Sequence, residues 1–118
     1  MSEKFELVKN YLLDLDLKIT SEDAAEELVV VEDPDNGIQN LVIDCEAPIV
    51  ILEQLIMKTP KDSGEFYKRL LQMNRTLVHG AFVLDEEGKH VLFRDTLQLE
   101  NLDQNELEAS IQALSLAL

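Results

Sequence analysis

A helical pattern that runs directly into a pair of turn-linked strands constrains this chain more than any other feature. Residues 70–88 read LLQMNRTLVHGAFVLDEEG. Apolar residues at helical spacing precede Asn74, and residues 77–84 then alternate between two sides, which is typical of a strand. The acidic segment 85–88 predicts a turn that Gly88 closes in the left-handed conformation. The stretch therefore predicts a helix followed by a hairpin, with a helix and strands before it and a closing helix after it.

The part of the chain before this stretch predicts one helix and three strands. The helix is expected to have Ser2 as its N-cap and to end near Asp16. Its apolar residues recur at three- and four-residue steps, at Phe5, Val8, Leu12 and Leu15. Lys18–Glu27 is interpreted as an irregular acidic approach to the first strand. The three strands are expected at residues 28–32, 38–45 and 49–58.

The strand at residues 49–58 is apolar on both of its sides, which suits a central strand covered on both faces. The second helix follows, with Asp62 or Ser63 as its expected cap. Its apolar face consists of Phe66, Leu70, Met73 and Leu77, and Tyr67 and Leu71 form an additional strip. The returning strand alternates at Val91, Phe93, Asp95 and Leu97. The last helix begins with the capping box Asp103-x-x-Glu106 and carries Leu107, Ile111, Leu114 and Leu118.

The order helix, three strands, helix, two strands, helix predicts an α+β fold of two layers, in which the helices cover an antiparallel sheet. The 118 residues fit a single domain, 1–118, that is large enough to bury a core. Hydrophobic residues make up 46% of the chain, an ordinary share for a globular protein, so disorder is not expected.

The chain is strongly acidic, with 24 acidic and 10 basic residues and a formal net charge of -14. This charge opposes binding to nucleic acid and to anionic membranes, so neither is expected as a partner. The longest apolar runs have four or five residues, too few to span a membrane, and Met1–Asn10 lacks the apolar core of a signal peptide. Cys45 is the single cysteine, which fits a reducing compartment. We therefore expect a soluble, cytoplasmic protein.

One segment and one pair of histidines, His79 and His90, resemble metal sites at first inspection. The segment 33–37 (DPDNG) looks like the start of a calcium loop, but the glycine and glutamate that an EF-hand needs would fall on Ile38 and Asp44. A hairpin turn explains it better. If residues 85–88 form the loop, Leu84 faces Lys89 and Val83 faces His90. His79 then lies opposite Arg94, four residues along the strand from position 83. At ~3.3 Å per residue the two histidines are roughly 13 Å apart, so no metal site is expected.

No catalytic residue and no cofactor is predicted either. Cys45 lies between Asp44 and Glu46, which oppose the formation of a thiolate nucleophile. The carboxylates of Glu86 and Glu87 are expected in a solvated turn. Paired carboxylates arise by chance among 24 acidic residues, so acid–base catalysis is not expected and the chain is predicted not to be an enzyme.

The apolar strips exceed what one small core needs. They comprise both faces of strand 49–57, the strip Tyr67 and Leu71, and Ala109, Ala113 and Leu116 beside the last helical stripe. Excess apolar surface on an acidic chain indicates contacts with another subunit or polypeptide. A generously packed core would also explain these residues.

The order of elements and the segment LLQMNRTLVHGAFVLDEEGKHVLF, with Asn74 and Gly80 between apolar positions, resemble the type III secretion chaperone-like (Tir chaperone or CesT-like) superfamily. The resemblance covers most of the chain and is greatest to the stand-alone YbjN-like branch. It implies a homodimer without enzymatic activity that holds an extended segment of a client protein. The alternative is a regulatory or stress-linked interaction module of the same fold that has no secretion client.

The resemblance also implies which surfaces are used. The second helix and the strand after it resemble a dimer-forming region, at Tyr67, Leu71, Val78 and Phe82. The early strands resemble a client-facing region, at Val29, Val31, Ile49 and Ile51. Clients of this family bind as an added strand whose side chains enter pockets.

Overall fold

The structure, a computed structural model, describes residues 3–62 and 64–117. The helices are α1 (Glu3–Asp14), α2 (Gly64–Asn74) and α3 (Gln104–Ala117), with a short 3-10 turn, η1 (Pro34–Asn36). The strands are β1 (Lys18–Asp23), β2 (Leu28–Asp33), β3 (Ile38–Glu46), β4 (Ile49–Lys58), β5 (Ala81–Leu84) and β6 (His90–Gln98). Ser2, Ser63 and Leu118, which were expected at two helix caps and in the last helical stripe, lie outside the described residues.

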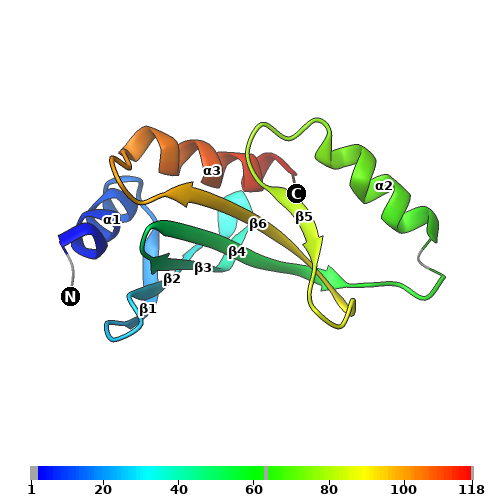
Figure 1. The fold of residues 1–118 in the computed structure, drawn as a ribbon, viewed down its shortest axis with the longest axis horizontal. Helices are drawn as coiled ribbons and strands as arrows, with labels where there is room; N and C mark the ends of the chain where they lie inside the picture. Colours follow the sequence, from blue (N-terminus) through cyan, green and yellow to red (C-terminus); the bar gives the residue numbers. More distant parts are fainter. Residues whose placement is uncertain (1–2, 63, 118) are drawn as a thin grey trace.

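The six strands form one sheet in the order β1-β2-β3-β4-β6-β5, and every neighbouring pair is antiparallel. Figure 1 shows α1 and α3 lying along one side of the sheet, whereas α2 extends at the far end beside β5. The molecule is therefore elongated, with principal extents of 46 × 28 × 26 Å. The α+β class and the antiparallel two-layer arrangement that the sequence predicts are confirmed.

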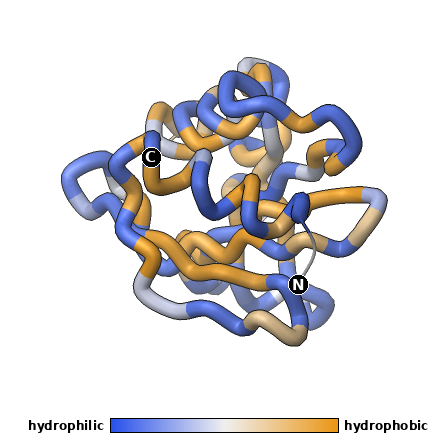
Figure 2. The backbone as a smooth tube through the Cα atoms, turned by 90° about the vertical axis from the view of Figure 1, so that its left-hand side faces the viewer, coloured by the Kyte–Doolittle hydropathy of each residue, from blue (hydrophilic) through white to orange (hydrophobic). Residues whose placement is uncertain are grey.

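The core lies between the sheet and the two helices α1 and α3. Because side chains alternate along a strand, every second residue of β2, β3, β4 and β6 points into this layer. Its largest fully buried side chains include Phe5, Leu12, Ile43, Leu52, Phe93 and Leu107. Figure 2 shows hydrophobic stretches through the middle of the fold and hydrophilic turns at its margin. The expected faces of the first and last helices are confirmed by the burial of Val8 and Leu114.

The interpretation of Lys18–Glu27 as irregular is wrong for most of the segment. Residues 18–23 form β1, which pairs with β2 from Lys18 opposite Glu32 to Asp23 opposite Leu28, with an irregularity between Ile19 and Ser21. As an edge strand, β1 is mostly exposed and polar, so it shows no apolar alternation. Hydrogen bonds to β2, rather than the burial of its own side chains, make this segment a strand.

The strand predicted at residues 77–84 is shorter than expected, because β5 begins only at Ala81. The second helix ends at Asn74, so Leu77 follows α2 rather than extending its apolar face. Gly80 interrupts the extended backbone with φ of +74°. A Cβ at this position would lie 2.2 Å from Cζ of Phe93, so the backbone passes directly against the buried ring.

The central strand β4 is covered on one face only, which corrects the prediction that both faces are covered. Val50, Leu52 and Gln54 are buried in the core layer. On the opposite face Ile51 is only half-buried, and Leu55 is 57% exposed. The second apolar side of β4 therefore faces outward in the isolated chain.

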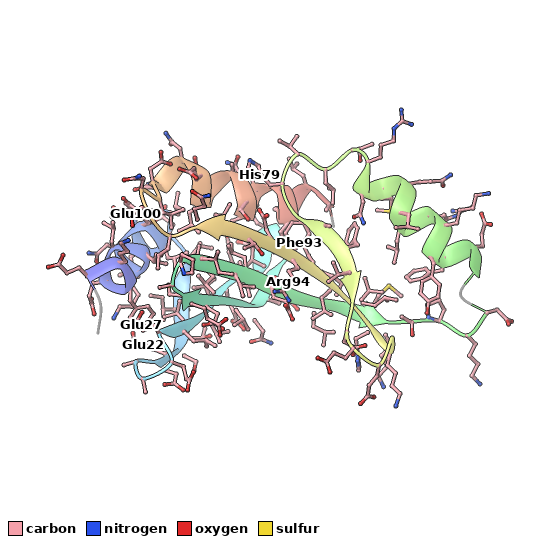
Figure 3. All side chains as sticks on the ribbon, in the orientation of Figure 1. Glu22, Glu27, His79, Phe93, Arg94 and Glu100 are labelled. Atoms are coloured by element: carbon pink, nitrogen blue, oxygen red, sulfur yellow. The ribbon has the colours of Figure 1, made fainter. Side chains whose placement is uncertain are left out.

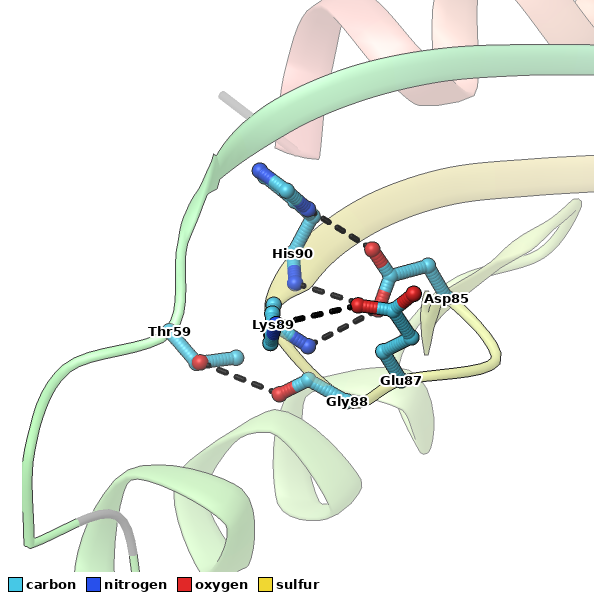
Figure 4. A network of polar contacts seen from close by, with 6 residues as sticks. All are labelled: Thr59, Asp85, Glu87, Gly88, Lys89 and His90. Carbon is cyan, nitrogen blue, oxygen red and sulfur yellow. Dashed lines mark hydrogen bonds and ion pairs between the residues drawn. The ribbon is translucent and has the colours of Figure 1, made fainter.

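The loop that joins β5 to β6 is held by Asp85 (Figure 4). One carboxylate oxygen, Oδ1, accepts hydrogen bonds from the backbone N–H groups of Lys89 (2.8 Å) and His90 (3.3 Å), and Oδ2 lies 2.7 Å from Nδ1 of His90. Thr59 at the end of β4 donates its hydroxyl to the Gly88 carbonyl. The strand register places Leu84 opposite Val91, so the expected pairing of Leu84 with residue 89 is wrong by two residues. Gly88 has the predicted left-handed conformation, with φ of +70°.

These bonds make the loop sensitive to acid. The hydrogen bond from His90 to Asp85 lowers the pKa of the Asp85 carboxyl, and the backbone N–H donors act in the same direction. A lowered carboxyl pKa contributes stability above the unfolded-state pKa, and that contribution is lost as the pH falls through the folded-state pKa. The urea midpoint of the wild-type chain should exceed that of Asp85→Asn at neutral pH, and the difference should shrink below about pH 4.

Glu86→Gln serves as the control, because it removes a carboxylate from the exposed part of the same loop. The urea midpoint of Glu86→Gln should stay close to that of the wild type at every pH measured. A difference between wild type and Asp85→Asn that does not change with pH would show that the charge of Asp85 is not involved.

Candidate interaction surfaces

Helix α2 is amphipathic, yet none of its residues (64–74) is buried. Phe66, Tyr67 and Leu70 are half-buried, whereas Leu71 is 71% exposed. A helix gains most of its stability from packing its apolar face, so an uncovered face of this size is unusual in a monomer. The apolar strip of α2 is therefore the first candidate interaction surface.

A groove of about 310 Å³ lies between α2 and β5 and continues this strip. It is lined by Tyr67, Leu70, Leu71, Phe82, Val83 and Leu84. Phe82 is 8% exposed and packs edge-on against Phe93, with the ring centroids 6.3 Å apart. The groove thus has an aromatic residue of the core at its base and exposed leucines at its rim.

Asn74 attaches the end of α2 to β5. Its side-chain Oδ1 accepts the backbone N–H of Phe82 at 2.7 Å, and its Nδ2 donates to the carbonyl of the same residue at 3.1 Å. The amide thereby takes the place of a neighbouring strand, because it satisfies both groups that Phe82 presents at the sheet edge. This contact orients α2 and closes the β5 edge at that position.

We expect Asn74→Ala to destabilise the chain by about 1–3 kcal/mol, because it leaves both backbone groups of Phe82 without their partners. Urea denaturation followed by circular dichroism measures the loss. Gln72→Ala, an exposed substitution in the same helix, should have little effect. Equal stability of the two variants would show that solvent replaces the amide without cost.

A second exposed apolar surface lies where the loop after α2 meets α3. Val78 and Leu116 are each 88% exposed, and they border a groove of about 400 Å³ that Ala109 and Ala113 also line. Val78, expected in the dimer region, is therefore fully accessible. It lies in the 75–80 loop that follows α2 rather than on the helix itself.

The third surface is the face of the sheet opposite α1 and α3, which we call the open face. Strand register places Val30, Val42, Ile49, Ile51, Leu55, Val83 and Leu92 on it, and none of these side chains is buried. Ile49 and Ile51, which were expected to face a client, lie here. Both remain accessible from solvent.

Val29 and Val31, the other two residues expected to face a client, lie on the core side of β2. Both have 0% exposure and pack in the main core cluster. Their side chains cannot contact a client while the core is intact, so this expectation is corrected. Val30, between them, points to the open face.

His79 approaches an acidic residue, as an enzyme site would require, but the geometry is not catalytic. Asp95 lies between Ser110 and His79. It accepts a 2.7 Å hydrogen bond from Ser110 Oγ, and its Oδ2 lies 3.9 Å from His79 Nδ1. In a hydrolytic triad the histidine contacts the serine. Here Ser110 has 0% exposure and is bonded to the carboxylate, so the serine is not placed as a nucleophile. Figure 3 shows His79 beside α3.

The remaining candidates for metal or thiol chemistry have structural roles. His90 bonds to Asp85 rather than approaching His79. The 33–37 turn contains η1 and closes at Gly37, with φ of +77°. Burial, reinforced by Glu27 and Asp44, raises the pKa of Cys45 to about 11. Within residues 3–62 and 64–117, no group of three or more histidine, cysteine or acidic side chains could hold a metal ion.

Comparison with known proteins identifies the family. The family model described as CesT_Tir_1 matches residues 1–118. The chain belongs to this family. None of the curated protein sequences matches the chain. In the part of the chain that the structure describes, no helix is long and apolar enough to cross a membrane.

Solved structures share the fold at low sequence identity. YbjN from E. coli, described as a candidate transcription regulator, has a TM-score of 0.70 and 12% identity, and the match covers 95% of this chain and 86% of YbjN. The HopA1–SchA chaperone–effector complex matches with a TM-score of 0.67 and 16% identity over 99% of this chain and 94% of that chain. The ExsC–ExsE complex matches with a TM-score of 0.68 and 17% identity over 99% of this chain and 92% of that chain. The resemblance to both YbjN and secretion chaperones is confirmed.

Sequence reasoning missed how the three surfaces divide. The apolar character of both sides of β4 was visible, but the sequence did not show which side is covered. Val30, Val42 and Leu92 join the open face only through strand register. These three half-buried apolar residues lie in three different strands, so they can be recognised as one surface only when the pairing of the strands is known.

Proposed function

We propose that this chain is a non-enzymatic, chaperone-like binding protein that acts as a homodimer in the cytoplasm and holds an extended segment of a client polypeptide. The uncovered apolar strip of α2 carries the proposal. A strip that is half-buried in the isolated chain, and continues into the groove beside β5, needs a second surface to remove it from water.

The charge around α2 opposes a second copy less than the charge of the rest of the chain does. Four of the ten basic residues lie within residues 61–75, namely Lys61, Lys68, Arg69 and Arg75. The same segment contains two acidic residues, Asp62 and Glu65. Two copies can therefore approach through α2 without bringing together the strongly acidic parts of a chain whose net charge is -14. Tyr67, Leu71 and Val78 would contact the partner copy, and Phe82 would support them from the core.

The client would lie across the open face, where Ile49 and Ile51 are accessible. This part of the proposal draws on membership of the CesT_Tir_1 family and on the fold shared with chaperone–effector complexes. An extended segment presents alternate side chains to a sheet, which matches the two-residue period of the exposed apolar positions.

Light scattering of the purified chain tests the dimer, and affinity capture from the native cell tests the client. We expect twice the mass of one chain and recovery of a specific protein through one segment. A monomer that captures no polypeptide would contradict the proposal.

The fold shared with YbjN favours a second candidate, an interaction module without a secretion client. It would bind a folded partner or a small ligand. Limited proteolysis of the captured complex separates the two, because a chaperone client stays protease-sensitive outside the bound segment, whereas a folded partner is protected throughout.

A further inference from the structure

We propose that the open face binds a polypeptide segment in which lysine or arginine side chains accompany apolar ones. This inference rests on the proposed function, because it names the chemistry of the client that such a protein would hold. The site is a groove of about 400 Å³ that crosses β3, β4 and β6.

The floor of this groove is apolar and continuous across three strands. Leu55 of β4 pairs with Leu92 of β6, and Val42 of β3 lies one strand away on the same face. Ile51 extends the floor along β4. None of these four side chains is buried, and Leu55 is 57% exposed. Apolar side chains of a bound segment would remove this floor from water.

The rim of the groove is acidic. Asp44 and Glu46 lie at one end, and Glu53 lies near the middle. The one basic residue that lines the groove, Arg94, is already bonded to Glu53, with Nη1 3.3 Å from Oε2. Figure 3 shows Arg94 near the middle of the sheet. The carboxylates of Asp44 and Glu46 thus have no basic counterpart in the groove.

These acidic side chains repel one another. Partial burial raises the pKa of the Asp44 carboxyl, and the neighbouring charges of Glu46 and Glu26 raise it further. A cationic side chain placed beside Asp44 would offset this repulsion. It would gain Coulomb attraction to both carboxylates, of which that of Asp44 is half-buried.

The same charges disfavour a second copy of this chain as the occupant. Packing two open faces together would bring Asp44 and Glu46 against the same acidic side chains of the other copy. A purely cationic small molecule would satisfy the rim but leave the apolar floor exposed. A segment that combines both characters satisfies the rim and the floor together.

Fluorescence anisotropy of labelled synthetic peptides tests the inference with the full chain. The probe has about twelve residues, which spans roughly 40 Å when extended, and alternates lysine with leucine and valine. In one matched peptide glutamate replaces lysine, and in another serine replaces the apolar residues. We expect the probe to bind more weakly as salt is raised, and each matched peptide to bind at least about tenfold more weakly.

Variants locate the site. The double substitution Asp44→Asn with Glu46→Gln should weaken binding of the probe by about fivefold or more, and Leu55→Ser should weaken it similarly. The double substitution Glu3→Gln with Asp14→Asn makes the same change in net charge on α1, and Leu13→Ser replaces an exposed leucine there. These control variants should bind as the wild type does.

Equal binding of the lysine and glutamate peptides, binding that is independent of the apolar residues, or equal effects of the groove and control variants would each overturn the inference. Absence of probe binding would overturn it too. The dimer mass and the capture of a client are measured separately. A dimer that captures an acidic or neutral client would therefore refute this inference while leaving the proposed function intact.

Discussion

Replacing Gly80 with valine should destabilise the chain by about 2–5 kcal/mol, a large fraction of the roughly 5–15 kcal/mol by which a typical domain is stable. Two costs add at this position. An L-residue with φ of +74° is strained, and the new Cβ would lie 2.2 Å from Cζ of Phe93. The ring of Phe93 is only 1% exposed and lies in the core cluster, so it has no free space to move into.

Gly88→Val separates the two costs. Gly88 has nearly the same backbone conformation, with φ of +70°, but an added Cβ would meet no atom within 4 Å. Its loss should be about 1–2 kcal/mol, the backbone strain alone. Urea denaturation of both variants gives the comparison. Equal losses would show that the core beside Phe93 accommodates the extra methyl groups and that the close approach at Gly80 is unimportant.

Leu71→Asp should convert the proposed dimer to a monomer that remains folded. Leu71 is 71% exposed in the isolated chain, so the substitution removes little core packing. In the dimer it would bury an unpaired carboxylate, which should raise the dissociation constant by at least about 100-fold. Light scattering over a range of concentrations measures the change, and circular dichroism reports whether the monomer is folded.

Leu13→Asp is the matched control for this experiment. Leu13 is 54% exposed on α1, which lies at the opposite end of the molecule from α2 (Figure 1). This variant should keep the mass of two chains. Unfolding of Leu71→Asp would place Leu71 in the core, and a dimer that survives the substitution would place the subunit contact away from α2.

The errors of the sequence interpretation have specific causes. Residues 18–23 looked irregular because an edge strand of polar residues has no apolar period to detect. Val29 and Val31 were expected to face a client, but the alternation along β2 turns them into the core and leaves Val30 outside. The alternation of side chains along a strand defines its two faces, but it does not show which of these faces a helix covers.

The amino-acid sequence alone is enough to predict the alternation of helices and strands, the acidic character, the turn at Gly88 and the excess of apolar side chains. Each of these depends on residues near one another in the chain, where spacing and backbone preference act directly. That α2 and the second face of β4 remain uncovered depends on how the whole chain packs. The packing of the whole chain also explains two contacts. The Asn74 side chain takes the place of a neighbouring strand for Phe82, and Gly80, between α2 and the hairpin, lies so close to the Phe93 ring that a side chain would not fit. These contacts join separate elements, so they follow from how the strands pair and the helices pack rather than from local pattern.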